Sequence, residues 1–89
     1  MKIKVKNMQS PNGNTIANQF VIYANNGKYF QSYNSVIAFI NNNNNIVLDE
    51  HYWDYSKTTS KYRNIFLGET KEQTRYQIEI GNYKLKNLN

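Results

Sequence analysis

The spacing of apolar residues changes once along this chain, after Tyr55. Before that point the chain has strand-like runs: residues 2–6 alternate lysine with branched apolar residues at a period of two, and the later runs are rich in strand-forming residues. After it, Tyr62, Ile65 and Phe66 stand at i, i+3 and i+4, the spacing of one face of an amphipathic helix. A strand period followed by a helix period predicts an α+β fold, with a small antiparallel sheet first and helices after it.

Four runs before Tyr55 have the composition of strands, and together they predict an N-terminal meander. These runs cover residues 2–6, 18–24, 28–40 and 46–48. Turn-forming residues separate the runs at 10–14, 25–27 and 41–45. The Asn-Gly pair at 26–27 predicts a hairpin with a type I′ turn, which needs positive φ at both central residues. Apolar residues change face across Asn34 and Ser35, so we expect a bulge or bend there.

The second half predicts one or two helices. Ser56 is suited to cap the start of a helix over residues 56–67, and Gly68 is suited to end it. Residues 70–73 have the capping-box form T-x-x-Q, which predicts a second helix up to Gly81, followed by a short terminal strand. The alternation of apolar residues at 76, 78 and 80 supports a strand there instead. We favour the helix because the capping signal is more specific.

Composition limits the class of protein. A chain of 89 residues predicts one domain, residues 1–89, too small for a large multi-step catalyst. The absence of cysteine excludes disulfides and thiol chemistry and favours a reducing, cytoplasmic location. The apolar runs reach five residues, too few to cross a membrane, and residues 1–6 do not resemble a signal peptide. The net charge of +5 favours anionic partners, although solubility alone also accounts for it.

Catalytic residues are scarce. The only histidine, His51, follows Asp49 at a spacing that would place both on one face of a strand. Such a pair could begin an acid–base or metal site, and a metal-dependent hydrolase or nuclease is the corresponding alternative. Two candidate ligands are too few, because catalytic metal sites need at least three protein groups. We therefore expect no enzyme, no metal and no cofactor.

The segment 53–64 carries the strongest binding signal. A helix that starts at Ser56 leaves the first amides unpaired at the positive end of its dipole, and hydroxyls surround them. Lys57 and Lys61 stand at i, i+4, where like charges repel unless an anion lies between them. Backbone amides, hydroxyls and ammonium groups are the groups that bind phosphate at helix N-termini. Capping alone is the competing explanation for the serine and threonines. The predicted surface comprises Ser56, Lys57, Thr58, Thr59, Lys61 and Arg63.

Tyrosines near basic residues extend this predicted surface. The tyrosines that we include are Tyr29, Tyr33, Tyr55 and Tyr62. Exposed aromatic rings beside cations stack on bases, and tyrosines also anchor protein interfaces. A thin core that uses tyrosine as bulk is the alternative, whereas a binding role requires at least four of the eight tyrosines to be exposed.

Several stretches resemble a family of small phage-encoded proteins of unknown function. These stretches are residues 18–20, 29–35, 52–62 and 81–89, and the resemblance extends over nearly the whole chain. It implies a phage origin and, by analogy with other compact phage proteins, inhibition of a host defence such as CRISPR inside the infected cell. Our leading hypothesis is a non-enzymatic, anti-CRISPR-like protein that binds a host protein or nucleoprotein. The alternatives are a nucleic-acid or nucleotide-binding module, and a structural or virion-assembly piece that self-associates, for example as a homodimer.

Overall fold

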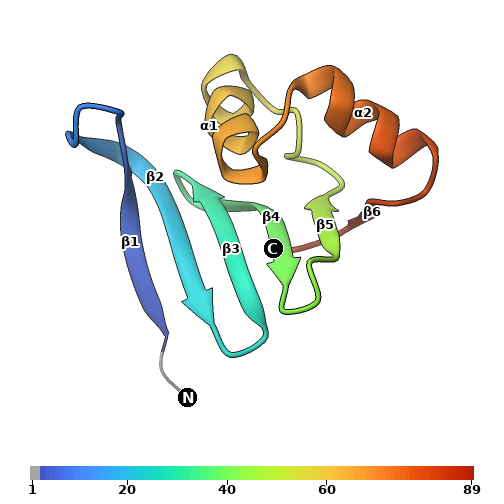
Figure 1. The fold of residues 1–89 in the computed structure, drawn as a ribbon, viewed down its shortest axis with the longest axis horizontal. Helices are drawn as coiled ribbons and strands as arrows, with labels where there is room; N and C mark the ends of the chain where they lie inside the picture. The colour runs from blue at the N-terminus through green and yellow to red at the C-terminus, as the bar shows by residue number, and fades with distance from the viewer. Residues whose placement is uncertain (1–2) are drawn as a thin grey trace.

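The computed structural model describes residues 3–89, so Lys2 of the first predicted strand lies outside the described residues. Within these residues the chain forms six strands and two helices (Figure 1). In chain order they are β1 (Lys4–Gln9), β2 (Thr15–Ala24), β3 (Gly27–Ser32), β4 (Ser35–Asn41), β5 (Ile46–Asp49), α1 (Lys57–Leu67), α2 (Lys71–Glu79) and β6 (Lys84–Lys86). The α+β class, the meander and the short terminal strand are as predicted from the sequence.

The strands form one sheet whose spatial order follows the chain, from β1 to β6. Consecutive strands from β1 to β5 pair antiparallel, and β6 pairs parallel to β5. A parallel pair needs a crossover connection, and α1 and α2 together supply it. The expectation of about four strands was too low because residues 28–40 form two strands and because 84–86 joins the sheet.

The bulge or bend predicted at Asn34 and Ser35 is a complete reversal of the chain between two strands. The chain reverses there in a tight turn, in which Tyr33 takes a left-handed backbone with φ of 55°. The irregularity in β3–β4 pairing lies a few residues away, where Phe30 pairs with Ala38 but Gln31 pairs with Val36. One residue of β4 is therefore unpaired at that point.

The hairpin between β2 and β3 forms where the sequence predicted it, but the turn is not type I′. Ala24 pairs with Gly27 across a two-residue turn, and neither Asn25 nor Asn26 has positive φ. Gly27 has φ of 145°, and a Cβ atom added there would lie 2.1 Å from the carbonyl oxygen of Ile40. Glycine is required at this position for two reasons: its φ is unfavourable for other residues, and the backbone of β4 lies too close to leave room for a side chain.

Both predicted helix starts are confirmed. The Ser56 hydroxyl caps α1 by accepting a hydrogen bond from the backbone N–H of Thr59, at 3.1 Å, and Gly68 ends α1 in a left-handed conformation. Thr70 and Gln73 form a complete capping box at the start of α2. The helix overrides the period-two alternation of residues 76–80 because the box satisfies two amides that would otherwise be unpaired.

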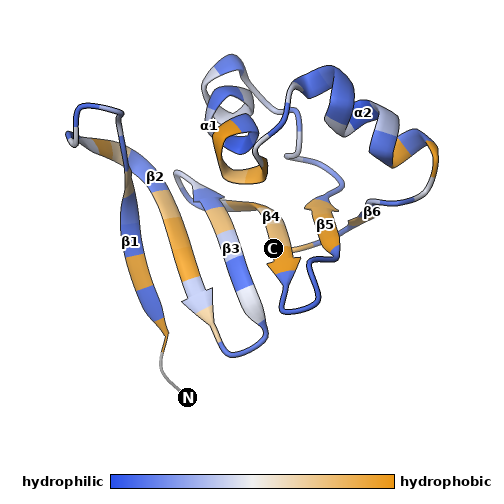
Figure 2. Cartoon of the chain, viewed as in Figure 1, coloured by the Kyte–Doolittle hydropathy of each residue, from blue (hydrophilic) through white to orange (hydrophobic). Residues whose placement is uncertain are grey.

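The helices cover one face of the sheet. The buried core comprises Met8, Phe30, Ile37, Ala38 and Leu48. Side chains of both helices pack against it, among them Phe66 of α1 and Ile78 of α2. Figure 2 shows that β2, β4, β5 and the end of α1 are the most apolar segments, whereas most of α2 is hydrophilic. Of the strands, α1 contacts β3 and β4, so the β1–β2 side of the sheet extends beyond it.

Candidate binding site at the start of α1

A chain of hydroxyl groups ties the first turn of α1 to the end of β3. The Ser56 hydroxyl donates to Oγ1 of Thr59 at 3.1 Å, and Oγ1 of Thr59 lies 3.1 Å from Oγ of Ser32. Thr59 and Ser32 are buried, whereas Ser56 is exposed. These hydrogen bonds between hydroxyl groups fix the position of Ser56 relative to the sheet, so the surface around this residue is rigidly supported.

A cavity of about 330 Å³ opens beside these hydroxyls, between the β3–β4 turn and the segment before α1. Its aromatic wall consists of Tyr33, Tyr52 and Tyr55, and we call it the tyrosine cavity. Tyr33 and Tyr55 are 53 % and 69 % exposed, and Tyr52 and Tyr55 meet edge to face with ring centroids 5.4 Å apart. Two predicted residues from distant parts of the sequence, Tyr33 and Tyr55, therefore share one site.

Tyr33 is held in an unfavourable backbone conformation. Positive φ is strained for a bulky residue. Two hydrogen bonds hold the segment in place: the Tyr33 amide donates to the carbonyl of Asn18 at 2.7 Å, and the Gln31 side chain donates to the carbonyl of Tyr33 at 2.7 Å. Strained residues of this kind cluster at functional sites, where surrounding contacts determine their position.

A groove of about 530 Å³ lies on the other side of Ser56 and contains Lys57 and Lys61. We call it the lysine groove. It also contains Asp54, whose carboxylate lies 3.1 Å from the ammonium group of Lys71. Burial alone would raise the pKa of Asp54, but hydrogen bonds from Lys71 and Ser60 and nearby positive charge hold that pKa below its usual value. Asp54 is therefore a carboxylate at neutral pH, and it reduces the attraction of the groove for an anion.

Arg63 does not belong to the exposed surface, and the expectation that it faces a ligand is wrong. Its side chain is completely buried, and its guanidinium donates to the carbonyl of Trp53 and to the side chain of Asn64, the latter at 2.9 Å. Nη1 of the guanidinium also lies 3.7 Å from Oδ1 of Asp54, and its central carbon lies 5.2 Å from the centroid of the Trp53 ring. Desolvation lowers the pKa of Arg63, and Asp54 partly offsets that effect. Arg63 holds the segment before α1 against the helix.

Other predicted residues are dispersed. Thr58 is exposed on the first turn of α1 but is not among the residues that line the lysine groove or the tyrosine cavity. Tyr62 is half-buried against the core, with the ammonium group of Lys61 5.4 Å from its ring centroid. Tyr29 lies on the sheet face opposite the core cluster and stacks on Phe39 at 4.4 Å between ring centroids, away from α1. Four of the eight tyrosines are exposed, the minimum expected for a binding role: Tyr23, Tyr33, Tyr55 and Tyr76.

Asp49 and His51 do not form an acid–base pair. The carboxylate of Asp49 is buried and accepts hydrogen bonds from the amides of His51, Tyr52 and Leu88 and from the side chain of Asn89. The His51 ring is exposed and lies 3.9 Å from Glu50. Within residues 3–89, no group of three or more histidine, aspartate or glutamate side chains is placed to hold a metal ion.

Sequence reasoning missed Ser32, Asn34 and Ser35, which line the tyrosine cavity opposite the α1 segment. They flank the β3–β4 turn, and no local pattern in the sequence marks a turn with tyrosine in a left-handed conformation. The contact between the hydroxyls of Ser32 and Thr59 holds this turn beside the start of α1.

Comparison with known proteins gives the chain a family but no activity. No helix in residues 3–89 is long and apolar enough to cross a membrane. No curated protein and no solved structure matches the chain. A family model matches residues 3–82, which span β1 to the end of α2. The chain therefore belongs to the family of unknown function DUF8033.

Proposed function

We propose that this chain is a non-enzymatic binding protein that engages a protein or nucleoprotein target through the tyrosine cavity. The observation that carries the proposal is the convergence of Tyr33, from the β3–β4 turn, with Tyr52 and Tyr55, from the segment before α1, around one cavity of about 330 Å³. Tyrosine supplies a large amphipathic contact area at low entropic cost and is enriched among the residues that dominate interface energies.

The charge distribution favours a protein surface over a phosphate group at this site. The lysine groove contains the carboxylate of Asp54 together with Lys57, Lys61 and Lys71, so its field is only moderately positive. The tyrosine cavity itself is lined by aromatic rings, hydroxyls, an amide and the aliphatic side chain of Ile37, without a charged side chain. Such a surface suits a partner that inserts an apolar or hydrogen-bonding side chain into the cavity and places acidic groups near Lys57 and Lys61.

The resemblance to small phage proteins supports a narrower role within this proposal. In that role the chain acts in the cytoplasm of an infected host cell and inhibits a defence system, as anti-CRISPR proteins do. Expression of the chain should then restore plaque formation by a phage that CRISPR interference otherwise blocks. The variant Tyr33→Ala/Tyr55→Ala should fail to restore it, and Tyr76→Ala, which alters an exposed tyrosine of α2, should behave as wild type.

Binding can be tested before the target is identified. The full chain is immobilised and exposed to host lysate, and captured proteins are quantified by mass spectrometry for the wild type, Tyr33→Ala/Tyr55→Ala and Tyr76→Ala. We expect wild type and Tyr76→Ala to capture a partner that stays bound at high salt. Recovery of this partner by Tyr33→Ala/Tyr55→Ala should be at least about tenfold lower, since interface tyrosines often contribute more than about 1 kcal/mol each. Equal recovery by all three proteins contradicts the proposal.

The same capture distinguishes the nucleic-acid or nucleotide alternative at the lysine groove. If this alternative holds, wild type captures nucleic acid, which is detected as a raised ratio of absorbance at 260 nm to that at 280 nm and is released at high salt. Reversing the charge of Lys57 and Lys61 would then abolish this capture. If that reversal abolishes capture and the tyrosine variants do not, the start of α1 binds an anion and the protein-binding proposal is wrong.

A further inference from the structure

The net positive charge of this protein is concentrated in the first half of the chain. Residues 1–48 contain four lysines and no acidic residue, whereas residues 49–89 contain seven basic residues and all six acidic ones. The first half therefore carries four of the five net charges. Near a low-dielectric surface, uncompensated charge of one sign attracts polyanions.

The pairing register places three of these lysines around one exposed tyrosine. Lys4 pairs with Tyr23, and Tyr23 pairs with Lys28, so the three lie in one row across β1, β2 and β3. Lys6 lies two residues from Lys4 and pairs with Val21 in the next row. Paired residues point to the same side of a sheet, and neighbouring strands lie about 4.8 Å apart, so the Cα atoms of Lys4 and Lys28 lie about 10 Å apart with Tyr23 between them.

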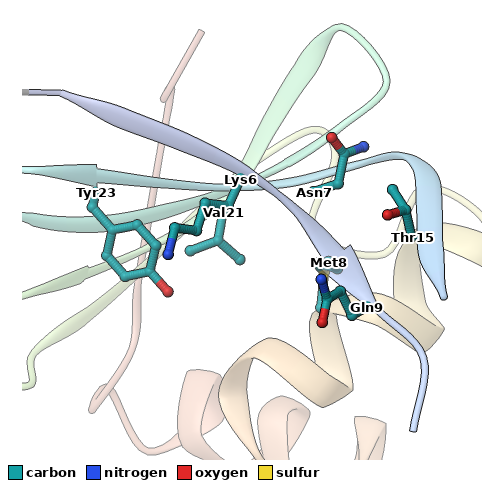
Figure 3. Close-up of a pocket in the computed structure, with 7 residues that line it drawn as sticks. All are labelled: Lys6, Asn7, Met8, Gln9, Thr15, Val21 and Tyr23. Carbon is teal, nitrogen blue, oxygen red and sulfur yellow. The ribbon is translucent and has the colours of Figure 1, made fainter. Parts of the chain in front are cut away.

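These side chains lie on the face that carries the helices, beyond the edge of α1. Figure 3 shows Lys6, Val21 and Tyr23 on the side of the strands toward the helices, and Asn7 on the other side. The ammonium group of Lys28 lies 5.6 Å from the ring centroid of Phe66, which marks where α1 begins to cover the sheet. The four residues Lys4, Lys6, Tyr23 and Lys28, which we call the Tyr23 platform, are thus bordered by the helical layer on one side and open on the other.

Two depressions meet at Tyr23. The one drawn in Figure 3 has a volume of about 570 Å³ and is lined by Lys6, Met8 and Tyr23, among others. The second, of about 290 Å³, lies between Tyr23, Lys28 and side chains of the asparagine loop at 41–45. Tyr23 is 45 % exposed and lines both depressions, and each of them is also lined by a lysine of the platform, Lys6 in the first and Lys28 in the second.

No acidic side chain neutralises the platform. In the part of the chain that the structure describes, the ion pairs involve Glu50 and Asp54, and none includes Lys4, Lys6 or Lys28. Lys4 and Lys6 share a face, and both lie near Lys28 across the sheet, so the three charges repel one another. Phosphate groups bound among them would remove that repulsion.

We propose that the Tyr23 platform binds single-stranded nucleic acid, with a base stacked on Tyr23 and phosphates at Lys4, Lys6 and Lys28. An exposed aromatic ring needs an unpaired, unstacked base as its partner, which a duplex does not present. The cations on both sides of the ring allow the backbone to continue across the strands past the stacked base. The platform shares no lining residue with the tyrosine cavity, so this inference does not depend on the proposed function.

Fluorescence anisotropy with a labelled 20-nucleotide oligothymidylate tests the proposal. Three phosphate contacts on a single strand predict a slope of log K against log salt of about −2, hence an affinity that falls roughly 18-fold between 50 and 200 mM salt. Lys6→Gln/Lys28→Gln should reduce the slope to about −0.7. Tyr23→Ala should weaken binding about 5- to 150-fold, whereas Tyr23→Phe, which keeps the ring, should stay within about twofold of wild type.

Matched controls separate this surface from the start of α1. Lys57→Gln/Lys61→Gln removes the same number of charges from the lysine groove, and it should leave the oligonucleotide affinity nearly unchanged. Circular dichroism verifies that each variant is folded. The proposal is overturned if wild type does not bind at 50 mM salt, if Tyr23→Ala binds like wild type, if a duplex binds as tightly as the single strand, or if the α1 variant weakens binding as much as the platform variant. Protein capture through the tyrosine cavity should survive the platform variants, so each proposal can fail alone.

Discussion

Replacing Asp49 with asparagine removes one negative charge and one acceptor oxygen from the point where β5, the following turn and the C-terminal segment meet. Oδ2 of Asp49 accepts from the amides of His51 and Tyr52, at 3.0 and 2.9 Å. Oδ1 accepts from the amide of Leu88 at 2.8 Å and from the side chain of Asn89 at 3.0 Å. The carboxylate is fully buried, so these four bonds replace all of its contacts with water.

The size of the effect follows from this geometry. An asparagine side chain has one oxygen, so its NH₂ group must face two of the four donors, whichever way the amide turns. Two hydrogen bonds to a charged group, at about 1.5–3 kcal/mol each, are then lost. A domain of this length has a free energy of unfolding of roughly 4–13 kcal/mol. We expect Asp49→Asn to lower it by about 3 kcal/mol and to lower the melting temperature by roughly 12–24 °C.

The pH dependence gives an independent check. Burial alone would raise the pKa of Asp49, but the four hydrogen bonds lower it below its ordinary value of 3.8. A carboxyl whose pKa is lower in the folded state stabilises the fold above the pKa of the unfolded chain, and that stabilisation is lost as the pH falls through the folded pKa. The stability difference between wild type and Asp49→Asn should therefore be largest near neutral pH and should narrow below about pH 4.

Urea unfolding, followed by the fluorescence of Trp53 and by circular dichroism between pH 3 and 7, measures both quantities. Glu50→Gln is the matched control, because it removes the same charge from the next residue, whose side chain is exposed. We expect the control to match wild type. A loss of less than about 1 kcal/mol for Asp49→Asn at pH 7, or a difference that does not narrow in acid, would refute the account of this carboxylate.

Three further substitutions test separate parts of the structure by urea unfolding. Gly27→Ala should cost at least about 3 kcal/mol, because its Cβ would lie 2.1 Å from the carbonyl oxygen of Ile40 at a φ of 145°, and wild-type stability would contradict that approach. Ser56→Ala should cost about 1 kcal/mol through loss of the α1 cap, and no loss would mean that Ser56 does not cap the helix. Arg63→Met should cost about 2–3 kcal/mol, since the carbonyl of Trp53 loses its donor, and a neutral effect would show that packing alone holds this segment.

Local signals in the sequence predicted local structure well. The caps at Ser56 and Thr70 depend on side chains within three residues of the amides that they satisfy, so the sequence contains the whole interaction. The asparagine loop at 41–45 and the hairpin at 25–27 were also predicted, because turn residues between strand-like runs are a short-range signal.

The errors arose where distant contacts decide the structure. Tyrosine disfavours a left-handed backbone, so no local rule marks the turn at Tyr33; the bond from its amide to Asn18 spans fifteen residues. Arginine is almost never fully buried unless paired, so Arg63 was placed on the surface, and its carbonyl partner ten residues earlier could not be anticipated. No local pattern in the sequence marks Tyr23, because its neighbours Lys4 and Lys28 come together only through the strand register.

The distribution of acidic residues is compatible with the two proposed binding surfaces on so small a fold. Asp49, Asp54 and Glu69 all accept hydrogen bonds from groups after residue 48, so these carboxylates stabilise the helical half of the chain. They compensate its basic residues and leave the tyrosine cavity without a strong field. Within residues 3–89, the lysines of β1 and β3 take part in no ion pair, so the Tyr23 platform is not compensated by a carboxylate. Because the two surfaces share no residue, variants of each should combine additively, to within about 0.5 kcal/mol, in stability and in binding to either ligand.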